Sequence, residues 1–207
     1  MSTPASLCVN LVIEGLIALA VWLYYRQRRF PASEKYYTFG PRFWTGSVDS
    51  CVMWPITAAT TYLLAIHLPA AAGVLLLTVQ NGAWLFYTVF MHARYGQTYG
   101  KMVCKVRVVD FPSEEAISFW QAFLREGIPL AVTFGIVAYE INAVSSGALT
   151  SDQIAKGVIF KSKAFLLLAA LPVLWFLAEA ITMLTNEKRR ALHDFIAGTV
   201  VVRTNVQ

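Results

Sequence analysis

The sequence predicts an all-α integral membrane protein with five transmembrane helices, an outside N-terminus and a cytosolic C-terminus. The 207 residues are 57% hydrophobic and only 14% charged, whereas a soluble domain carries about 25% charged residues. Several apolar runs approach or exceed the ~20 residues that cross a bilayer as a helix. Basic residues gather at the ends of these runs, which is the pattern that sets orientation in a membrane.

The first apolar run, residues 7–25, is followed by Arg26, Arg28 and Arg29, with no charge before it. A cleavable signal peptide has its positive charges before the apolar core. The reversed order predicts an uncleaved helix that begins outside and leads into a polar cytosolic linker. Residues 1–39 are therefore interpreted as an additional N-terminal helix and linker, and residues 40–207 as the main membrane domain.

Four further runs predict the remaining membrane helices, over residues 43–66, 70–92, 118–139 and 164–185. Pro55 is expected to kink the first of these four helices, and the very short turn after it makes the next helix antiparallel. Ser118 and Gln121 have the spacing of a capping box, in which each side chain hydrogen-bonds a free backbone amide of the first turn. The loop over residues 140–163 is polar, with a short helix predicted over residues 151–160.

A small cytosolic β element and a C-terminal amphipathic helix complete the predicted fold. The segment from residue 94 to residue 118 is too polar to span, and its residues 103–109 alternate like a strand. The tail predicts an amphipathic helix over residues 187–197, with Gly198 as its C-terminal cap, and a second strand over residues 199–203. With this topology, 13 of the 17 lysines and arginines are cytosolic and 3 lie outside.

Charged residues inside the predicted membrane helices form one layer. Asp49, Arg125 and Glu179 each lie six residues from the cytosolic end of their helix, which is about 9 Å of depth. Glu126 is adjacent to this level, and Arg42 can reach towards it from the interface. The hypothesis is a buried cluster on the cytosolic side, in which Arg125 is the leading partner of Asp49.

Two interpretations of this cluster remain open. Buried ion pairs can simply determine which helices meet, because one unpaired charge there would destabilise the bundle. Alternatively, a carboxylate in surplus over the arginines can bind a proton or a cation. A transport site would then comprise Arg42, Asp49, Arg125, Glu126 and Glu179.

Two further motifs lie in the cytosolic segments. GQTYGK, with Gly96, Thr98, Gly100 and Lys101, is one residue too short for a phosphate-binding loop, so it predicts a sharp turn with Lys101 at the lipid headgroups. In the tail, no hydrolytic nucleophile accompanies His193 and Asp194. We expect Arg190, His193 and Asp194 to hold the tail under the bundle as a structural clamp, or to act as a cytosolic gate if the protein transports.

Three motifs resemble the RDD family of small bacterial membrane proteins. The first is Arg42-Phe43-Trp44 with Val48-Asp49; the second is GQTYGKMVCKVRVVD followed by ISFWQAFLRE, residues 96–126; the third is RRALHDFIAGTVVV, residues 189–202. The family is named after one arginine and two aspartates, which the resemblance places at Arg42, Asp49 and Asp194. It implies the bacterial cytoplasmic membrane, and some family members have been linked to sodium/proton antiport.

Together these features favour a transporter or cation/proton exchanger for Na⁺, K⁺ or H⁺. The alternative is a non-transporting membrane scaffold or accessory subunit, which the extra first helix and the basic cytosolic surface also fit. A homo-oligomer or a membrane-protein partner is compatible with either. The sequence gives no reason to expect an enzyme activity, a cofactor, a metal site or nucleic-acid binding.

Overall fold

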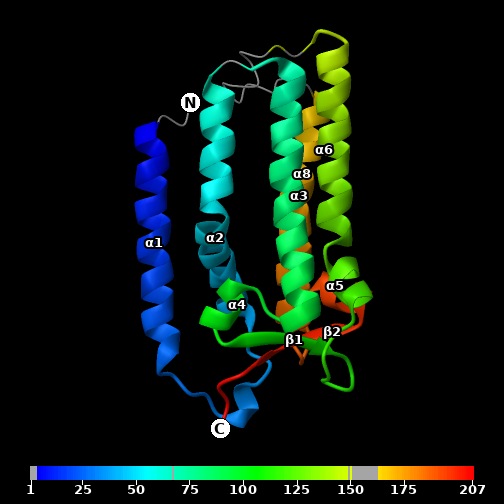
Figure 1. The fold of residues 1–207 in the computed structure, drawn as a ribbon. Coiled ribbons are helices and arrows are strands. Elements are labelled where there is room, and N and C mark those ends of the chain that lie inside the picture. Colours follow the sequence, from blue (N-terminus) through cyan, green and yellow to red (C-terminus); the bar gives the residue numbers. More distant parts are fainter. Residues whose placement is uncertain (1–3, 67, 149, 151–162) are drawn as a thin grey trace.

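In the part of the chain that the structure describes, the long helices run side by side, and a small sheet lies near one end of them (Figure 1). The structure is a computed structural model, and it describes residues 4–66, 68–148, 150 and 163–207. The short helix expected over residues 151–160 lies outside these described residues. The long helices are α1 (Pro4–Arg26), α2 (Phe39–Ala65), α3 (Ala70–Tyr95), α6 (Gly127–Ser145) and α8 (Lys163–Thr185).

The long helices have the surface of a membrane protein. By length and composition, Val9–Arg26, Ala70–Tyr95 and Gly127–Ser145 can each cross a bilayer, and Ala170–Thr185 is a shorter apolar helix. Large apolar side chains stay uncovered, with Leu16 61%, Phe86 70% and Leu167 71% exposed. Helices that are apolar all round need a non-aqueous environment, so these faces fit lipid.

The predicted fourth helix is broken at Glu126, which corrects the expectation of one helix over residues 118–139. The chain forms α5 (Phe119–Arg125), then α6 from Gly127, with Glu126 between them at φ −90° and ψ 0°. Pro129 explains the break, because it has no N–H to give to the carbonyl of Arg125 in a continuous helix. The capping box is confirmed: the Ser118 hydroxyl accepts from the Gln121 amide, and the Gln121 side chain accepts from the Ser118 amide.

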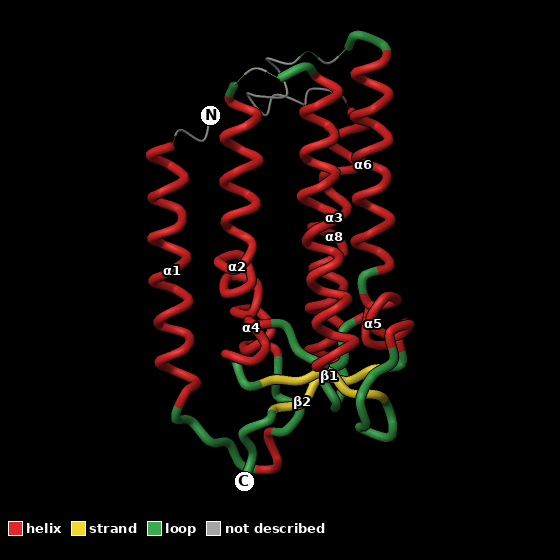
Figure 2. Tube along the Cα trace, viewed as in Figure 1, coloured by secondary structure: helices red, strands yellow, loops and turns green. Residues whose placement is uncertain are grey.

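The predicted β element is present, with shifted boundaries (Figure 2). Strands β1 (Val106–Asp110) and β2 (Thr199–Arg203) pair antiparallel, with Val108 opposite Val201. The first residue of the predicted strand, Val103, instead ends a short helix, α4 (Tyr99–Val103), and the strand begins three residues later. The tail helix is shorter than predicted, α9 (Leu192–Ala197), because Arg189 has a positive φ of 50° that interrupts a helix.

The sheet is covered on both faces, so it acts as a rigid base for the helices. Val106, Val108 and Val201 are fully buried and pack with residues of the long helices such as Val48 and Val89. The other face, with Val109, Val200 and Val202, packs against Tyr36 of the α1–α2 linker and Phe111. A short helix, η1 (Ala32–Glu34), lies in that linker.

Glycine is required directly after α3, where the chain turns towards α4 and passes close to β1. Gly96 has a φ of 68° and its N–H donates to the His92 carbonyl at 2.8 Å. Gly198 caps α9 in the same left-handed conformation, with a φ of 64°, as predicted. A Cβ on Gly96 would lie only 2.8 Å from the Val108 carbonyl oxygen.

We therefore expect Gly96→Ala to lower the free energy of unfolding by about 2–3 kcal/mol, from the left-handed backbone and the contact with β1. Thermal unfolding of the purified protein in detergent measures this loss. Gly15→Ala in α1 is the control, because a Cβ there meets nothing within 4 Å. Equal melting temperatures for the two variants would contradict the prediction.

Candidate functional site

The carboxylate of Asp49 is held by donors from outside its own helix. Asp49 is 5% exposed on α2. The Tyr87 hydroxyl and the Gly100 N–H both donate to Oδ1 at 2.7 Å, and the Thr98 hydroxyl donates to Oδ2 at 2.7 Å. Hydrogen bonds to a carboxylate are stronger than neutral ones, so Asp49 fixes the α3–α4 turn against α2.

The turn motif between α3 and α4 contains the residues that hold the turn against α2. Thr98 caps α4 by accepting from the Lys101 amide at 3.3 Å. A Cβ on Gly100 would lie 2.2 Å from the Thr45 carbonyl oxygen of α2. Only glycine allows this approach, and the approach brings the Gly100 N–H to Asp49.

A second buried carboxylate, Asp194 of α9, binds two arginines. Asp194 is 0% exposed. Arg42 Nη1 lies 2.6 Å from its Oδ2, and Arg125 Nη1 is paired with its Oδ1. The Ala191 N–H donates to Oδ2 at 2.9 Å, which starts α9. Burial alone would raise the pKa of Asp194, but the two guanidinium groups outweigh it and hold the pKa well below its usual range.

The expected pairing of Arg125 with Asp49 is therefore wrong. The depth argument assumed a continuous fourth helix, whereas Arg125 ends the separate helix α5, which packs against α9. Arg125 also contacts His193, with its Nη2 2.8 Å from the imidazole Nε2. The structure thus separates the predicted layer into an Asp49 site and an Asp194 cluster.

The tail residues Arg190, His193 and Asp194 lie together at the sheet end. The Arg190 side chain donates to the backbone carbonyls of Thr199 and Asp194, both at 2.9 Å. The imidazole of His193 pairs with Glu179 of α8 through Nδ1. These contacts join the end of α8 to α9 and β2.

Glu126 belongs to neither group. Its Oε1 lies 4.0 Å from Nδ1 of His92. His92 is 2% exposed, and neither ring nitrogen has a hydrogen-bond partner among the described residues. Sequence reasoning missed His92 and Tyr87; the available signal was their polarity within the predicted helix 70–92.

Two cavities adjoin these charged groups. One of about 180 Å³ lies between α3 and α6 and is lined by Glu126, Asn81, Thr78 and Thr133. The other, of about 320 Å³, lies at the sheet end between α2 and α8 and will be called the arginine cavity. Its charged or titratable lining residues are Arg42, Lys101, Arg125, Glu179 and His193.

Lys101 lines this second cavity. The sequence had predicted that its side chain lies at the lipid headgroups. Burial and the nearby Arg125 guanidinium lower the pKa of Lys101 to about 8. The side chain therefore remains mostly charged at neutral pH.

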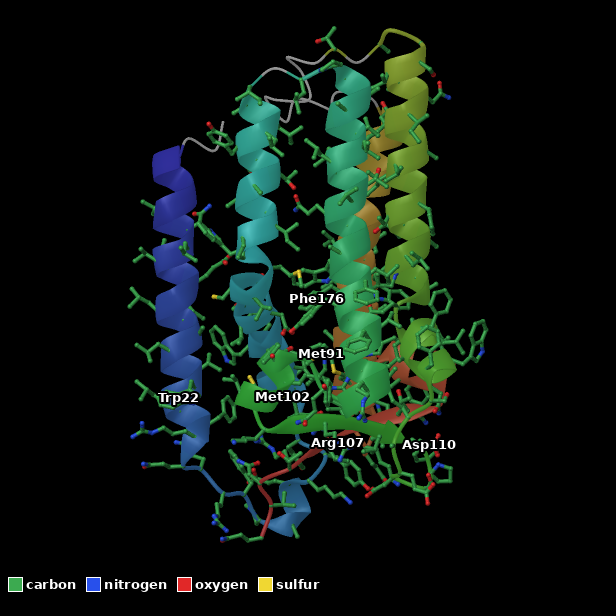
Figure 3. All side chains as sticks on the ribbon, viewed as in Figure 1. Trp22, Met91, Met102, Arg107, Asp110 and Phe176 are labelled. Carbon is green, nitrogen blue, oxygen red and sulfur yellow. The ribbon has the colours of Figure 1, made fainter. Side chains whose placement is uncertain are left out.

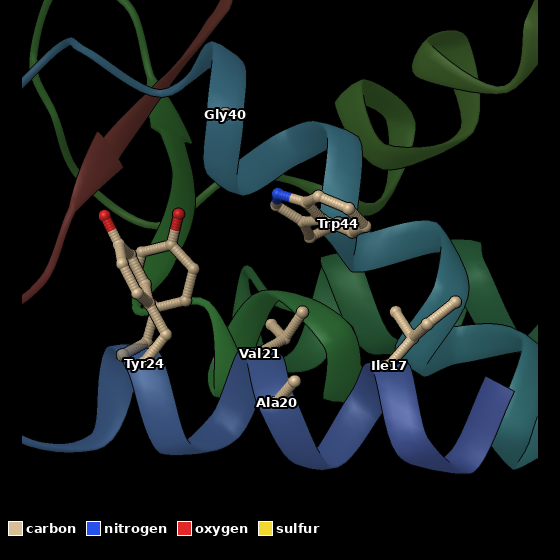
Figure 4. Close-up of a pocket in the computed structure, with 7 residues that line it drawn as sticks. Ile17, Ala20, Val21, Tyr24, Gly40 and Trp44 are labelled. Carbon is tan, nitrogen blue, oxygen red and sulfur yellow. The ribbon is translucent and has the colours of Figure 1, made fainter. Parts of the chain in front are cut away.

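A further cavity of about 490 Å³ lies between α1 and α2 (Figure 4). Ile17 and Val21 of α1 face Trp44 of α2 there. Its described lining residues carry no charged side chain. Another cavity, of about 520 Å³, lies beyond the end of α1 and is lined by Arg26, Arg28, Arg29 and Lys105. Nitrogen and oxygen atoms gather near the sheet end (Figure 3).

The apolar helices and the charged groups at one end define a small helical membrane protein. The RDD family model matches residues 36–198, and the chain belongs to this family. The match contains Arg42, Asp49 and Asp194, and α1 lies outside it, in agreement with the sequence motifs. No curated protein and no solved structure matches the chain.

Removal of the Asp49 carboxylate should destabilise the fold. Asp49→Ala leaves three donors without an acceptor, and we expect it to cost about 3 kcal/mol of unfolding free energy. Asp49→Asn keeps one carbonyl acceptor and should cost about 1–2 kcal/mol. Unfolding in detergent measures both, with Ser50→Ala as the neighbouring control; the idea fails if Asp49→Ala is no less stable than Ser50→Ala.

Loss of the Asp194 charge should cost more and depend on pH. Asp194→Asn leaves Arg42 and Arg125 without their carboxylate, with an expected loss of about 3–5 kcal/mol. Because the folded pKa is depressed, the wild-type advantage is complete above the unfolded value of about 3.9 and is lost as pH falls through the folded pKa.

Melting temperatures of wild type and Asp194→Asn between pH 3 and pH 8 test this dependence. The difference should stay constant above about pH 5 and shrink in acid. Glu187→Gln, at an exposed acid of the same segment, should change little. A difference that grows in acid would contradict the assignment.

Proposed function

We propose that this RDD-family protein exchanges Na⁺ or K⁺ for protons across the bacterial cytoplasmic membrane, with Glu126 as the exchanging carboxylate. The observation that carries the proposal is the cavity at the α5–α6 break. Glu126 lines it together with the amide of Asn81 and the hydroxyls of Thr78 and Thr133. The other lining residues are mainly apolar, such as Leu85, Leu130 and Val137, so these few polar groups lie in a low-polarity site. Interrupted helices form Na⁺ and H⁺ sites in known transporters.

The proposed topology has five spans, with the sheet end in the cytosol. The α2 helix has 27 residues and the α8 helix has 23, so each is long enough to cross a bilayer. Arg42 of α2 and Glu179 of α8 are paired with Asp194 and His193 at the sheet end. The basic residues of the sheet end, among them Arg107, Arg190 and Arg203, support a cytosolic location by the positive-inside rule.

Glu126 suits exchange better than Asp49 or Asp194. Each aspartate has donors on both carboxylate oxygens, so a proton or cation would have to displace them. Glu126 instead faces a cavity and lies beside His92, whose nitrogens have no partner within the described chain. An imidazole next to a carboxylate can pass a proton between the cavity and the sheet end.

Flux measurements in proteoliposomes test this function. With imposed Na⁺, K⁺ or pH gradients, wild type should couple cation movement to proton movement. Glu126→Gln should reduce the coupled flux to the level of empty liposomes, because an amide does not bind a proton or balance a cation. Glu115→Gln, at an exposed acid near the start of α5, should retain full flux.

The same experiment distinguishes a structural role. Asp49→Asn should retain coupled flux per folded protein if Asp49 is a structural residue. Retained flux in Glu126→Gln would refute the assignment of the carboxylate. A scaffold or accessory subunit would instead be supported if wild type shows no flux in any gradient and one membrane protein co-purifies with it in a fixed ratio. The fully bonded aspartates also fit that role.

A further inference from the structure

We propose that the arginine cavity between α2 and α8 binds a phosphate group, carried by an anionic phospholipid headgroup or by a soluble phosphate. This site is separate from the Glu126 cavity and does not depend on cation exchange. Three cationic side chains, Arg42, Lys101 and Arg125, line it. The described lining includes one acidic side chain, Glu179, which is already paired with His193.

Arg42 carries the main evidence for a missing anion. Its side chain is 9% exposed, and its Nη1 is bound to Asp194. Its Nε and Nη2 are buried and have no hydrogen-bond partner among the described residues. These two nitrogens form the edge of a guanidinium that binds two oxygens of one oxyanion. Unpaired buried donors are costly, and a phosphate would supply both acceptors.

Two neighbouring cations strengthen the site. Lys101 lines the same cavity, and its ammonium has no hydrogen-bond partner within the part of the chain described here. Arg125 also has a buried Nε without a partner among these residues. The charges of Arg42 and Arg125 are shared with Asp194 behind them, so the ammonium of Lys101 remains available to an anion.

The surroundings of the cavity fit an amphiphile. Phe43 and Phe176 line it and are 57% and 49% exposed; Phe176, on α8, is labelled in Figure 3. Gly46 also lines it, and a Cβ there would meet nothing within 4 Å. A phosphate can therefore enter beside α2 while acyl chains stay on the exposed rings, which favours the lipid as the source.

Binding to delipidated, detergent-solubilised full-length protein tests the site. The probes are phosphatidylglycerol, inorganic phosphate and, as a lipid without phosphate, diacylglycerol. Native mass spectrometry counts bound lipid, and the rise in melting temperature with probe concentration gives the affinity. We expect saturable binding of phosphatidylglycerol, competition by inorganic phosphate if the soluble source is also accepted, and no saturable binding of diacylglycerol.

Three variants and one control locate the binding. Arg42→Lys retains a cation for Asp194 but loses the two-nitrogen edge, Lys101→Met removes the free ammonium, and Gly46→Leu fills the cavity. Each should weaken phosphatidylglycerol binding by about tenfold or more. Arg94→Met, at an exposed basic residue near the end of α3, removes the same charge elsewhere and should bind like wild type.

The outcomes are decisive. The proposal is overturned if the wild-type protein binds neither phosphatidylglycerol nor inorganic phosphate. Unchanged affinity in Lys101→Met and Gly46→Leu also overturns it, as does an equal loss in Arg94→Met, which would indicate general charge attraction. Melting curves without ligand test whether each variant is folded. If Arg42→Lys does not fold, the affinities of Lys101→Met and Gly46→Leu decide the question.

Discussion

The structure depends on the carboxylate of Asp194 and the two guanidinium groups that it binds. Asp194 is fully buried, and Arg42 and Arg125 come to it from α2 and α5. Charges removed from water are tolerated only when their partners are in place. The first turn of α2, the end of α5 and the tail must therefore assemble together, and the sheet beneath them holds that arrangement.

The charged groups divide by how fully they are bonded. Asp49 and Asp194 accept on both oxygens, and they hold the turn and the tail. Glu126, His92 and Arg42 line cavities or keep unsatisfied buried nitrogens. Saturated groups resist exchange with a ligand, whereas unsatisfied ones gain from it. Both proposed ligand sites therefore use groups of the second set.

Much of the fold follows from local sequence signals, while the pairing of charges does not. Apolar run length predicted the long helices, and the Ser118 capping box and Gly198 predicted helix ends that the structure confirms. Depth along a helix gives no direction around its axis, so it could not choose between Asp49 and Asp194 as the partner of Arg125. The break at Glu126 had a signal in Gly127 and Pro129, but its effect on Arg125 required the packing of α5 on α9.

The closure of the sheet also constrains how the protein is made. Among the described residues, strand β1 pairs with β2, which follows the long helices α1, α2, α3, α6 and α8 in the chain. Residues 205 and 207 hydrogen-bond back to Phe30 before α2. During synthesis Arg42 is translated well before its acidic partner, Asp194. The nascent chain must therefore keep that cation solvated until the tail emerges from the ribosome, and a chain truncated before residue 194 never gains the partner.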